Sequence, residues 1–218
     1  MESTYGRQVA FICERARAHR RVDEHLLTEA VVLALGVVVE TRDRNTLGHC
    51  QRLAAHAAAT GASLGLSGDE LRTLYRGGYL HDVGKIAIPD GVLLKTDSLT
   101  PEEFAVMKLH PVIGDALCRR LPMLDRVRPI VRWHHERLDG TGYPDGLKGD
   151  RIPLLAQLMG IADVYDAMTS ARPYKAAQSP ATSCEILMDE VKRGWRRRDL
   201  VEAFIDAVVP RTTAGLAA

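Results

Sequence analysis

Residues 154–166 read Leu-Leu-Ala-Gln-Leu-Met-Gly-Ile-Ala-Asp-Val-Tyr-Asp, an apolar segment that carries two aspartates towards its end. Pro153 precedes the segment, and proline is favoured where a helix begins, so we expect a largely buried helix here. Burying Asp163 unpaired among these side chains would cost free energy. A metal ion or another cation would remove that cost. A structural cap or ion pair is the alternative that the sequence leaves open.

Helix signals recur on both sides of this segment. Ser67-Gly68-Asp69-Glu70 and Thr100-Pro101-Glu102-Glu103 have the spacing of capping boxes, and Ser179-Pro180 opens a further helix. Residues 31–39 are rich in β-branched side chains, which favours a strand, but the uninterrupted pattern from Asp23 to Glu40 favours a helix. No pair of alternating strands occurs elsewhere. The predicted fold class is therefore all-α.

The composition excludes several classes of protein. Lys and Arg total 29 against 28 Asp and Glu, and this balance argues against a scaffold for nucleic acid polymers. The apolar run over residues 30–39 is too short to span a membrane, and the N-terminus lacks a secretory signal. The cysteines form no C-x-x-C pair, which indicates reduced thiols in a cytoplasmic protein.

Two interruptions of the helical pattern each follow histidines. Residues 86–99 come soon after His81-Asp82, and the glycine-rich residues 139–150 follow His134-His135-Glu136. In a chain with 8 histidines, one such dipeptide carries little information, because a single histidine is more often structural than a ligand. Their position next to loops that can approach a ligand closely makes these histidines candidates for a site.

The motifs become specific when they are taken together and in order. Combined, they resemble the HD-GYP family, a branch of the HD phosphohydrolases, over roughly residues 40–210. They are Thr41-Arg42-Asp43, Thr46-Leu47-Gly48-His49 with Arg52, His81-Asp82-Val83-Gly84-Lys85-Ile86, His110-Pro111, His134-His135-Glu136, Asp139-Gly140-Thr141-Gly142-Tyr143-Pro144, the residues 162–169, and Arg172-Pro173-Tyr174.

The resemblance implies an HD-domain bundle of about seven to eight helices around a buried site for two metals. Histidine nitrogens mixed with carboxylates suit Fe or Mn, with Zn as a third option, better than Mg. Asp82 is expected to bridge the two metals. Carried over by position, the metal ligands are His49, His81, Asp82, His110, His134, His135 and Asp163.

The resemblance also implies that the protein is a phosphodiesterase that hydrolyses cyclic di-GMP to linear pGpG, and further to GMP in some members. A hydroxide that bridges the metals would attack phosphorus, with Asp82 and Lys85 as the catalytic residues. Lys85, Arg172 and Tyr174 would bind the substrate. Asp43, Arg52 and Asp166 are expected to orient ligands through hydrogen bonds. Gly142-Tyr143-Pro144 is expected to shape the edge of the site, support the ligands or contact a partner, and His19, His25 and His56 match no motif.

Two departures from the family pattern modify these expectations. Asn45 stands where some members have a glutamate that holds a third metal, so we expect two metals and pGpG as the main product. The 40 residues before Thr41 are too few for the receiver or sensor domain that often precedes the family's catalytic domain. We therefore expect a free-standing catalytic domain, with N-terminal helices over residues 1–39, the catalytic domain over 40–210 and a flexible tail over 211–218.

Other interpretations stay open on the sequence alone. The chain could act on another cyclic dinucleotide or a mononucleotide, or it could be a non-enzymatic module that binds a diguanylate cyclase or another signalling protein, and an oligomer is compatible with all of these. The residues Arg196-Arg197-Arg198 attract anions or simply open the last helix, and the second interpretation is favoured.

Overall fold

The computed structural model of the 218-residue chain describes residues 24–43, 48–170 and 176–209. Within these ranges the chain is helical and contains no strand, so the predicted all-α class is confirmed. Helices of nine or more residues are joined by short helices and 3-10 turns. In chain order the elements are α2 (Glu24–Arg42), α3 (His49–Ser63), α4 (Gly68–Leu80), η1 (Val83–Ala87), α5 (Asp90–Leu93), α6 (Pro101–Met107), α7 (His110–Cys118), η2 (Pro122–Leu124), α8 (Arg128–Trp133), η3 (Gly149–Arg151), α9 (Leu154–Thr169), α10 (Pro180–Lys192) and α11 (Arg198–Val208).

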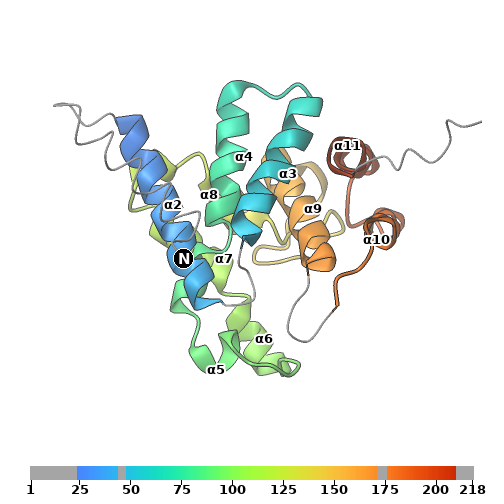
Figure 1. The fold of residues 1–218 in the computed structure, drawn as a ribbon. Coiled ribbons are helices and arrows are strands. Elements are labelled where there is room, and N and C mark those ends of the chain that lie inside the picture. Colours follow the sequence, from blue (N-terminus) through green and yellow to red (C-terminus); the bar gives the residue numbers. More distant parts are fainter. Residues whose placement is uncertain (1–23, 44–47, 171–175, 210–218) are drawn as a thin grey trace, which may run out of the picture.

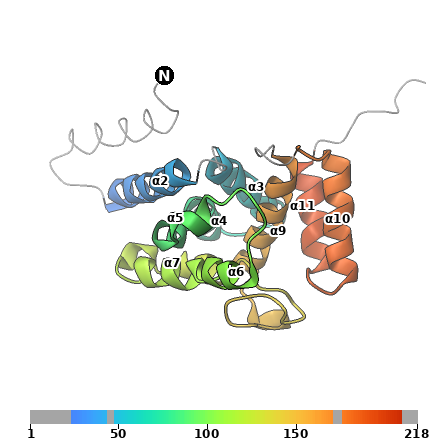
Figure 2. The same ribbon diagram turned by 90° about the horizontal axis from the view of Figure 1, so that it is seen from below.

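The helices form a bundle with α3, α4 and α9 in its middle (Figure 1). Helix α2 packs against α4 on one side, and α10 and α11 pack against α9 and α3 on the other. Helices α5, α6 and α7 lie at one end of the bundle and face the viewer in Figure 2. These three helices follow one another in the chain, so one continuous stretch, residues 90–118, forms that end of the bundle.

Two clusters of apolar side chains hold this arrangement together. One joins α3, α9 and α11 through Leu53, Met159 and Phe204, all of which are fully buried. The other joins α2 to α4 through Val32 and Tyr79. Burying one such side chain stabilises the fold by about 1.5–3 kcal/mol.

The local signals in the sequence are confirmed at several helix ends. Ser67 and Thr100 each form the predicted capping box, with Glu70 and Glu103 as the reciprocal partners. Such caps contribute about 1 kcal/mol each. Ser179 likewise accepts a hydrogen bond from the backbone N–H of Thr182 at the start of α10.

Residues 31–39, which the sequence left ambiguous, lie inside helix α2. The helix is buried along one face only, because Val32 is fully buried whereas Val38 is 47% exposed. Helix α2 also runs through residues 39 and 40, where the N-terminal helices were expected to meet the catalytic domain. The division into domains stays a prediction.

Gly84 allows η1 to approach α7 closely. A Cβ atom at position 84 would overlap the carbonyl oxygen of His110 and the backbone nitrogen of Gly114. This contact brings the residues that follow His81 against the helix that carries His110. The packing of η1 against α7 therefore requires a glycine at position 84.

Two further expectations concern the cysteines and the membrane. Cys50 and Cys118 are buried free thiols and Cys184 is a half-buried one, while Cys13 lies outside the described residues. None of the helices in the described part of the chain is long and apolar enough to cross a membrane.

Candidate metal centre

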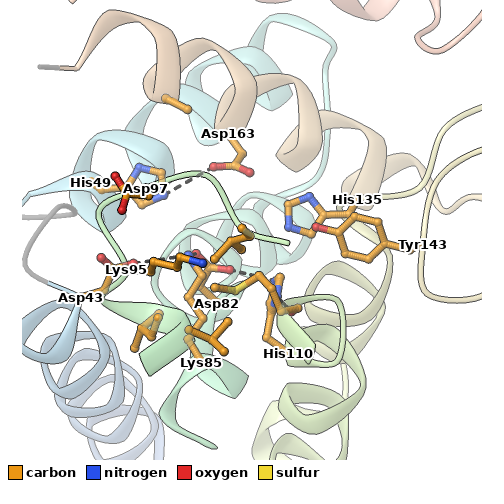
Figure 3. A pocket seen from close by; sticks show the side chains of 15 residues that line it. Asp43, His49, Asp82, Lys85, Lys95, Asp97, His110, His135, Tyr143 and Asp163 are labelled. Atoms are coloured by element: carbon orange, nitrogen blue, oxygen red, sulfur yellow. Dashed lines mark hydrogen bonds and ion pairs between the residues drawn. The ribbon is translucent and has the colours of Figure 1, made fainter. Parts of the chain in front are cut away.

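A cavity of about 380 Å³ opens at the end of the bundle where α5 and α6 lie (Figure 3). Helices α3 and α9, the turn after α4 and the start of α7 all contribute side chains to its wall. Figure 3 shows histidines and aspartates pointing into it from these separate elements. Residues lining it include His49, Asp82, Lys85, His110, His135 and Asp163.

The seven residues proposed as metal ligands fall into two groups in which the donor atoms lie within 4.8 Å of one another. One group is Asp82, His110, His134 and His135, and the other is His49, His81 and Asp163. The structure therefore brings together every residue that the sequence assigned to the metals. Their role as ligands remains a prediction.

Asp82 lies between the two groups. Its Oδ1 atom is 3.1 Å from His110 Nε2, and its Oδ2 atom is 3.2 Å from His81 Nε2. One carboxylate thus faces histidines of both groups with different oxygens. This is the arrangement that a bridging carboxylate requires.

In three of the histidines, the ring nitrogen Nδ1, which points away from the site, lies at hydrogen-bond distance from a backbone carbonyl oxygen. His81 Nδ1 lies 3.0 Å from the carbonyl oxygen of Gly78, and His110 Nδ1 lies 2.8 Å from that of Met107. His134 Nδ1 lies 3.1 Å from the carbonyl oxygen of Ile130. An Nδ1–H donor to a carbonyl leaves Nε2 as a lone pair for a metal, and metal-binding histidines are commonly oriented in this way.

Several buried atoms lack a partner at the places where a metal would be needed. Asp82 Oδ1, His110 Nε2 and His134 Nε2 form no hydrogen bond with the described residues. His110 Nε2 and Asp82 Oδ1 are 3.1 Å apart, but with the proton of His110 on Nδ1 both atoms offer only lone pairs to each other. Buried polar atoms are normally satisfied, and each exception costs free energy. Because these atoms converge and consist of imidazole nitrogens and a carboxylate oxygen, the donor set fits a transition metal.

His49 is oriented by a carboxylate instead of a carbonyl. Its Nδ1 atom lies 2.7 Å from Oδ2 of Asp166, and Arg52 Nε donates to Oδ1 of the same carboxylate over 2.6 Å. Asp166 is buried, and although burial alone would favour the neutral acid, His49 and Arg52 hold the pKa of Asp166 far below its usual range. The expectation that Arg52 and Asp166 orient a ligand agrees with these contacts.

Burial keeps two imidazoles neutral. It lowers the pKa of His134 to about 3 and holds the pKa of His135 well below its usual range, and the positive charge of neighbouring histidines acts in the same direction. Neutral imidazole is the form that coordinates a metal. Burial by itself would raise the pKa of the Asp82 carboxyl. The positive charges of Lys85 and His81 outweigh that effect and hold the pKa of Asp82 well below its usual range.

Lys85 projects into the same cavity and is paired with carboxylates. Its Nζ atom is 2.6 Å from Asp82 Oδ2 and 3.5 Å from Asp43 Oδ2. Burial opposes its charge, yet these two carboxylates raise the pKa of Lys85, so the amine stays protonated. Arg42 fixes the turn that carries Lys85 by donating to the carbonyl oxygen of Lys85 over 2.9 Å.

The glycine-rich loop forms one wall of the cavity through Tyr143. The Tyr143 ring lies against that of His135, with centroids 4.6 Å apart (Figure 3). Glu136 anchors the loop by accepting hydrogen bonds from the backbone N–H groups of Asp145 and Leu147. The loop therefore shapes the edge of the site, which is one of the roles expected for it.

Some residues fall outside this picture or were missed. Arg172 and Tyr174 lie outside the described residues, as do Asn45 and His19, and the side chain of His25 is not described. His56 belongs to neither ligand group and packs against Tyr165 and Phe204. Lys95 and Asp97 line the cavity but were not predicted. Their only signal was their place in the interruption over residues 86–99.

Comparison with known proteins agrees with this geometry. Residues 36–196 match the model of a family described as HD domain. The chain is 47% identical over 145 residues to "Cyclic di-GMP phosphodiesterase response regulator RpfG" of Xanthomonas campestris, which covers 66% of the chain and 38% of that protein. It is 35% identical over 187 residues to "3'3'-cGAMP-specific phosphodiesterase 2" of Vibrio cholerae, which covers 85% of the chain and 36% of that protein.

A solved structure supports the fold. "Bd1817, a HDG"Y"P protein from Bdellovibrio bacteriovorus" matches 93% of the chain and 69% of its own length with a TM-score of 0.66 at 22% identity. The resemblance noted in the sequence is confirmed by these findings. The chain spans well under half the length of the two relatives described above.

Proposed function

The chain belongs to the HD domain family, and from this premise we propose that it is a metal-dependent phosphodiesterase that hydrolyses cyclic di-GMP to linear pGpG. The observation that carries the proposal is the convergence of unsatisfied donor atoms on one cavity. Asp82 Oδ1, His110 Nε2 and His134 Nε2 belong to the ligand group beside this cavity, are buried, and form no hydrogen bond with the described residues. The relative that is 47% identical over 145 residues bears the name of this activity.

The two ligand groups would each hold one divalent transition metal, with Asp82 shared between them. Iron or manganese fits the mixture of imidazoles and carboxylates, and zinc is the third option. When bound, the metals would supply an activated water molecule and offset the charge of the phosphate oxygens. Asp166 would keep His49 in the tautomer that carries its proton on Nδ1, because its carboxylate accepts the hydrogen bond from Nδ1–H, and Nε2 is then free to face the site.

The reaction needs one water molecule for each bond that is cut. An oxygen–phosphorus bond forms to the water oxygen, the bond from phosphorus to the O3′ atom of the sugar breaks, and the proton released ends on that oxygen. Lys85 stays charged beside Asp82 and is placed to hold a phosphate oxygen as charge builds on it. Arg172 and Tyr174 are further predicted contacts to the substrate.

The experiment that tests the function is direct. The protein is reconstituted anaerobically with ferrous iron or with manganese and incubated with cyclic di-GMP, and the products are separated by chromatography. We expect pGpG from the wild type and none from Asp82→Ala, which removes the carboxylate that faces both groups. The exposed Asp189→Ala, which breaks only a surface pair with Lys192, is the matched control and should retain full activity.

Each alternative outcome points to another function. Cleavage of 3'3'-cGAMP but not of cyclic di-GMP would place the chain with the relative from Vibrio cholerae that carries that specificity in its name. Binding of cyclic di-GMP by the metal-loaded protein without any product would favour a signalling module. Association with a diguanylate cyclase and formation of oligomers are predictions that need separate tests.

A further inference from the structure

A second cavity of about 360 Å³ lies behind the wall formed by Tyr143 and His135. These two residues line both this cavity and the larger one that holds the candidate metal ligands. Figure 3 shows both rings standing together at the edge of the larger cavity. We call the second space the distal cavity. The distal cavity is therefore adjacent to the cavity of the candidate metal ligands, on the other side of Tyr143 and His135.

Two cations of the distal cavity are held on aromatic faces. The guanidinium carbon of Arg137 lies 3.6 Å from the centroid of the Trp195 ring, and Lys108 Nζ lies 5.2 Å from the centroid of Phe104. The N–H of Leu138 donates to the carbonyl oxygen of Trp195 over 3.1 Å, so the indole and Arg137 are held together by the backbone as well. Such stacking fixes the charge in place without neutralising it.

The charge of the distal cavity is not balanced by its own carboxylate. Glu190 accepts a hydrogen bond from Arg196 Nε over 3.0 Å, so this pair cancels. Within the described residues, neither Arg137 nor Lys108 forms an ion pair with a carboxylate. Asp139 is close enough to Arg137 for the two charges to interact. The hydrogen bond from the N–H of Thr141 is the main cause that lowers the pKa of Asp139, and the positive charge of Arg137 adds to it.

The metal cavity lacks a similar free cation in the part of the chain that the structure describes. Lys85 is paired with Asp82 over 2.6 Å, and Lys95 is paired with Glu103 over 2.6 Å. A cyclic dinucleotide carries two phosphodiester groups on opposite sides of its ring, and each keeps a negative charge. With one phosphate at the metals, the second phosphate needs a cationic donor of its own, since burying an unpaired charge is costly.

From these contacts we propose that Arg137 and Lys108 form the subsite for the second, uncleaved phosphate of the cyclic dinucleotide. The proposal rests on the proposed function and assigns the part of the substrate that a simple phosphodiester lacks. Arg137 presents the planar edge of its guanidinium to two phosphate oxygens, while Lys108 acts as a point charge. The subsite favours substrates with a second phosphate. It does not depend on metal binding, because neither Arg137 nor Lys108 belongs to the ligand groups.

The test compares two substrates and three variants. The substrates are cyclic di-GMP and bis(p-nitrophenyl) phosphate, which has only one phosphate. Arg137→Gln should lower kcat/KM for cyclic di-GMP by about tenfold or more, as expected for a lost hydrogen bond to a charged group, and leave kcat/KM for the single phosphodiester unchanged. Arg137→Lys keeps the charge and should lose less.

Arg193→Gln is the matched control. Arg193 also lies over the Trp195 ring, at 5.1 Å, but it is not among the residues that line the distal cavity. This variant should leave both substrates unaffected, which separates loss of stacking on Trp195 from loss of the phosphate contact. Thermal unfolding of each variant reports whether the fold is intact.

Two results would overturn the subsite. If Arg137→Gln hydrolyses cyclic di-GMP as fast as the wild type, no second phosphate is held there. If it slows both substrates equally, Arg137 acts through the metal centre. Should the wild type cleave neither substrate, the proposed function fails, and calorimetry with cyclic di-GMP and the manganese-loaded protein then decides the subsite. Weaker binding to Arg137→Gln than to Arg193→Gln supports it, and equal binding or none refutes it.

Discussion

His49 Nδ1 lies 2.7 Å from Oδ2 of Asp166, although 117 positions separate the two residues in the sequence. Helix α3 supplies the histidine and helix α9 supplies the carboxylate. Arg52, one turn after His49, donates to both oxygens of Asp166. Packing of α3 on α9 thus orients an imidazole that projects into the candidate metal centre, and the fold and the site depend on the same contact.

Asp166→Asn should weaken metal binding while the chain still folds. The neutral amide oxygen accepts the hydrogen bond from Nδ1–H of His49 more weakly than a carboxylate oxygen does, and it adds no negative charge, so the imidazole is held less firmly and loses part of its basicity. Changes of this kind typically cost about 10–100-fold in metal affinity. The measurement is competition with a chelator, and the melting temperature of the metal-free protein serves as the check on folding. An unchanged metal affinity would show that Asp166 only supports the structure.

Added manganese should raise the melting temperature of the protein, and a chelator should lower it. Metal binding would satisfy buried nitrogen atoms that form no hydrogen bond with the described residues, such as His110 Nε2 and His134 Nε2. A ligand that binds only the folded state stabilises by about 2.7 kcal/mol at 100 times its Kd. In Asp82→Ala the shift with manganese should disappear. A shift of equal size in that variant would place the manganese elsewhere.

Elemental analysis of the loaded protein should give two tightly bound metals per chain. The donor atoms form two groups, and Asp82 faces histidines of both. Asn45 offers a neutral amide where a third metal would need a carboxylate, and it lies outside the described residues. Three metals that survive dialysis would contradict this prediction and the expectation of pGpG as the main product.

The ordered motifs made it possible to predict which histidines and aspartates lie together. His81 and Asp82 directly follow α4, and His134 and His135 follow α8, so each pair lies just after a helix end that the turn signals in the sequence could place. The capping boxes of Ser67 and Thr100 depend on neighbours within one turn, and they were predicted correctly for that reason. These helix ends could be predicted because they depend on residues that are close together in the sequence.

Contacts between distant segments could not be predicted in the same way. Arg196 belongs to a run of arginines that was expected to open the last helix, yet it is largely buried and paired with Glu190. The stacking of Arg137 on Trp195 joins a loop to the turn after α10, and no local pattern indicates it. The ambiguity of residues 31–39 was resolved by packing, since α4 and η1 cover one face of α2. Propensity alone favoured a strand there.

Gly84→Ala should destabilise the protein by about 1–3 kcal/mol, the usual cost of overpacking. The added methyl would overlap the carbonyl oxygen of His110 and the backbone nitrogen of Gly114, both of which are backbone atoms with little room to move. Gly91→Ala is the control, because a Cβ atom at that position meets nothing within 4 Å. Urea denaturation of both variants measures the difference. Equal stabilities would show that η1 and α7 can separate without cost.

His56 should make the free energy of unfolding fall as the solution becomes acidic. Burial of the ring, with the charge of Arg52 acting in the same direction, lowers the pKa of His56 below the ordinary value of 6.5. The unfolded chain therefore takes up the proton first, and stability is lost as the pH falls below 6.5 towards the lower folded pKa. His56→Gln carries no titrating group, so it should lose less stability than the wild type between about pH 7.5 and 5.5. Denaturation in the presence of a chelator keeps metal release out of the comparison, and groups common to both proteins cancel in the difference. Parallel stability curves for the two proteins would mean that the ring is solvated in the folded state, in conflict with its packing against Tyr165 and Phe204.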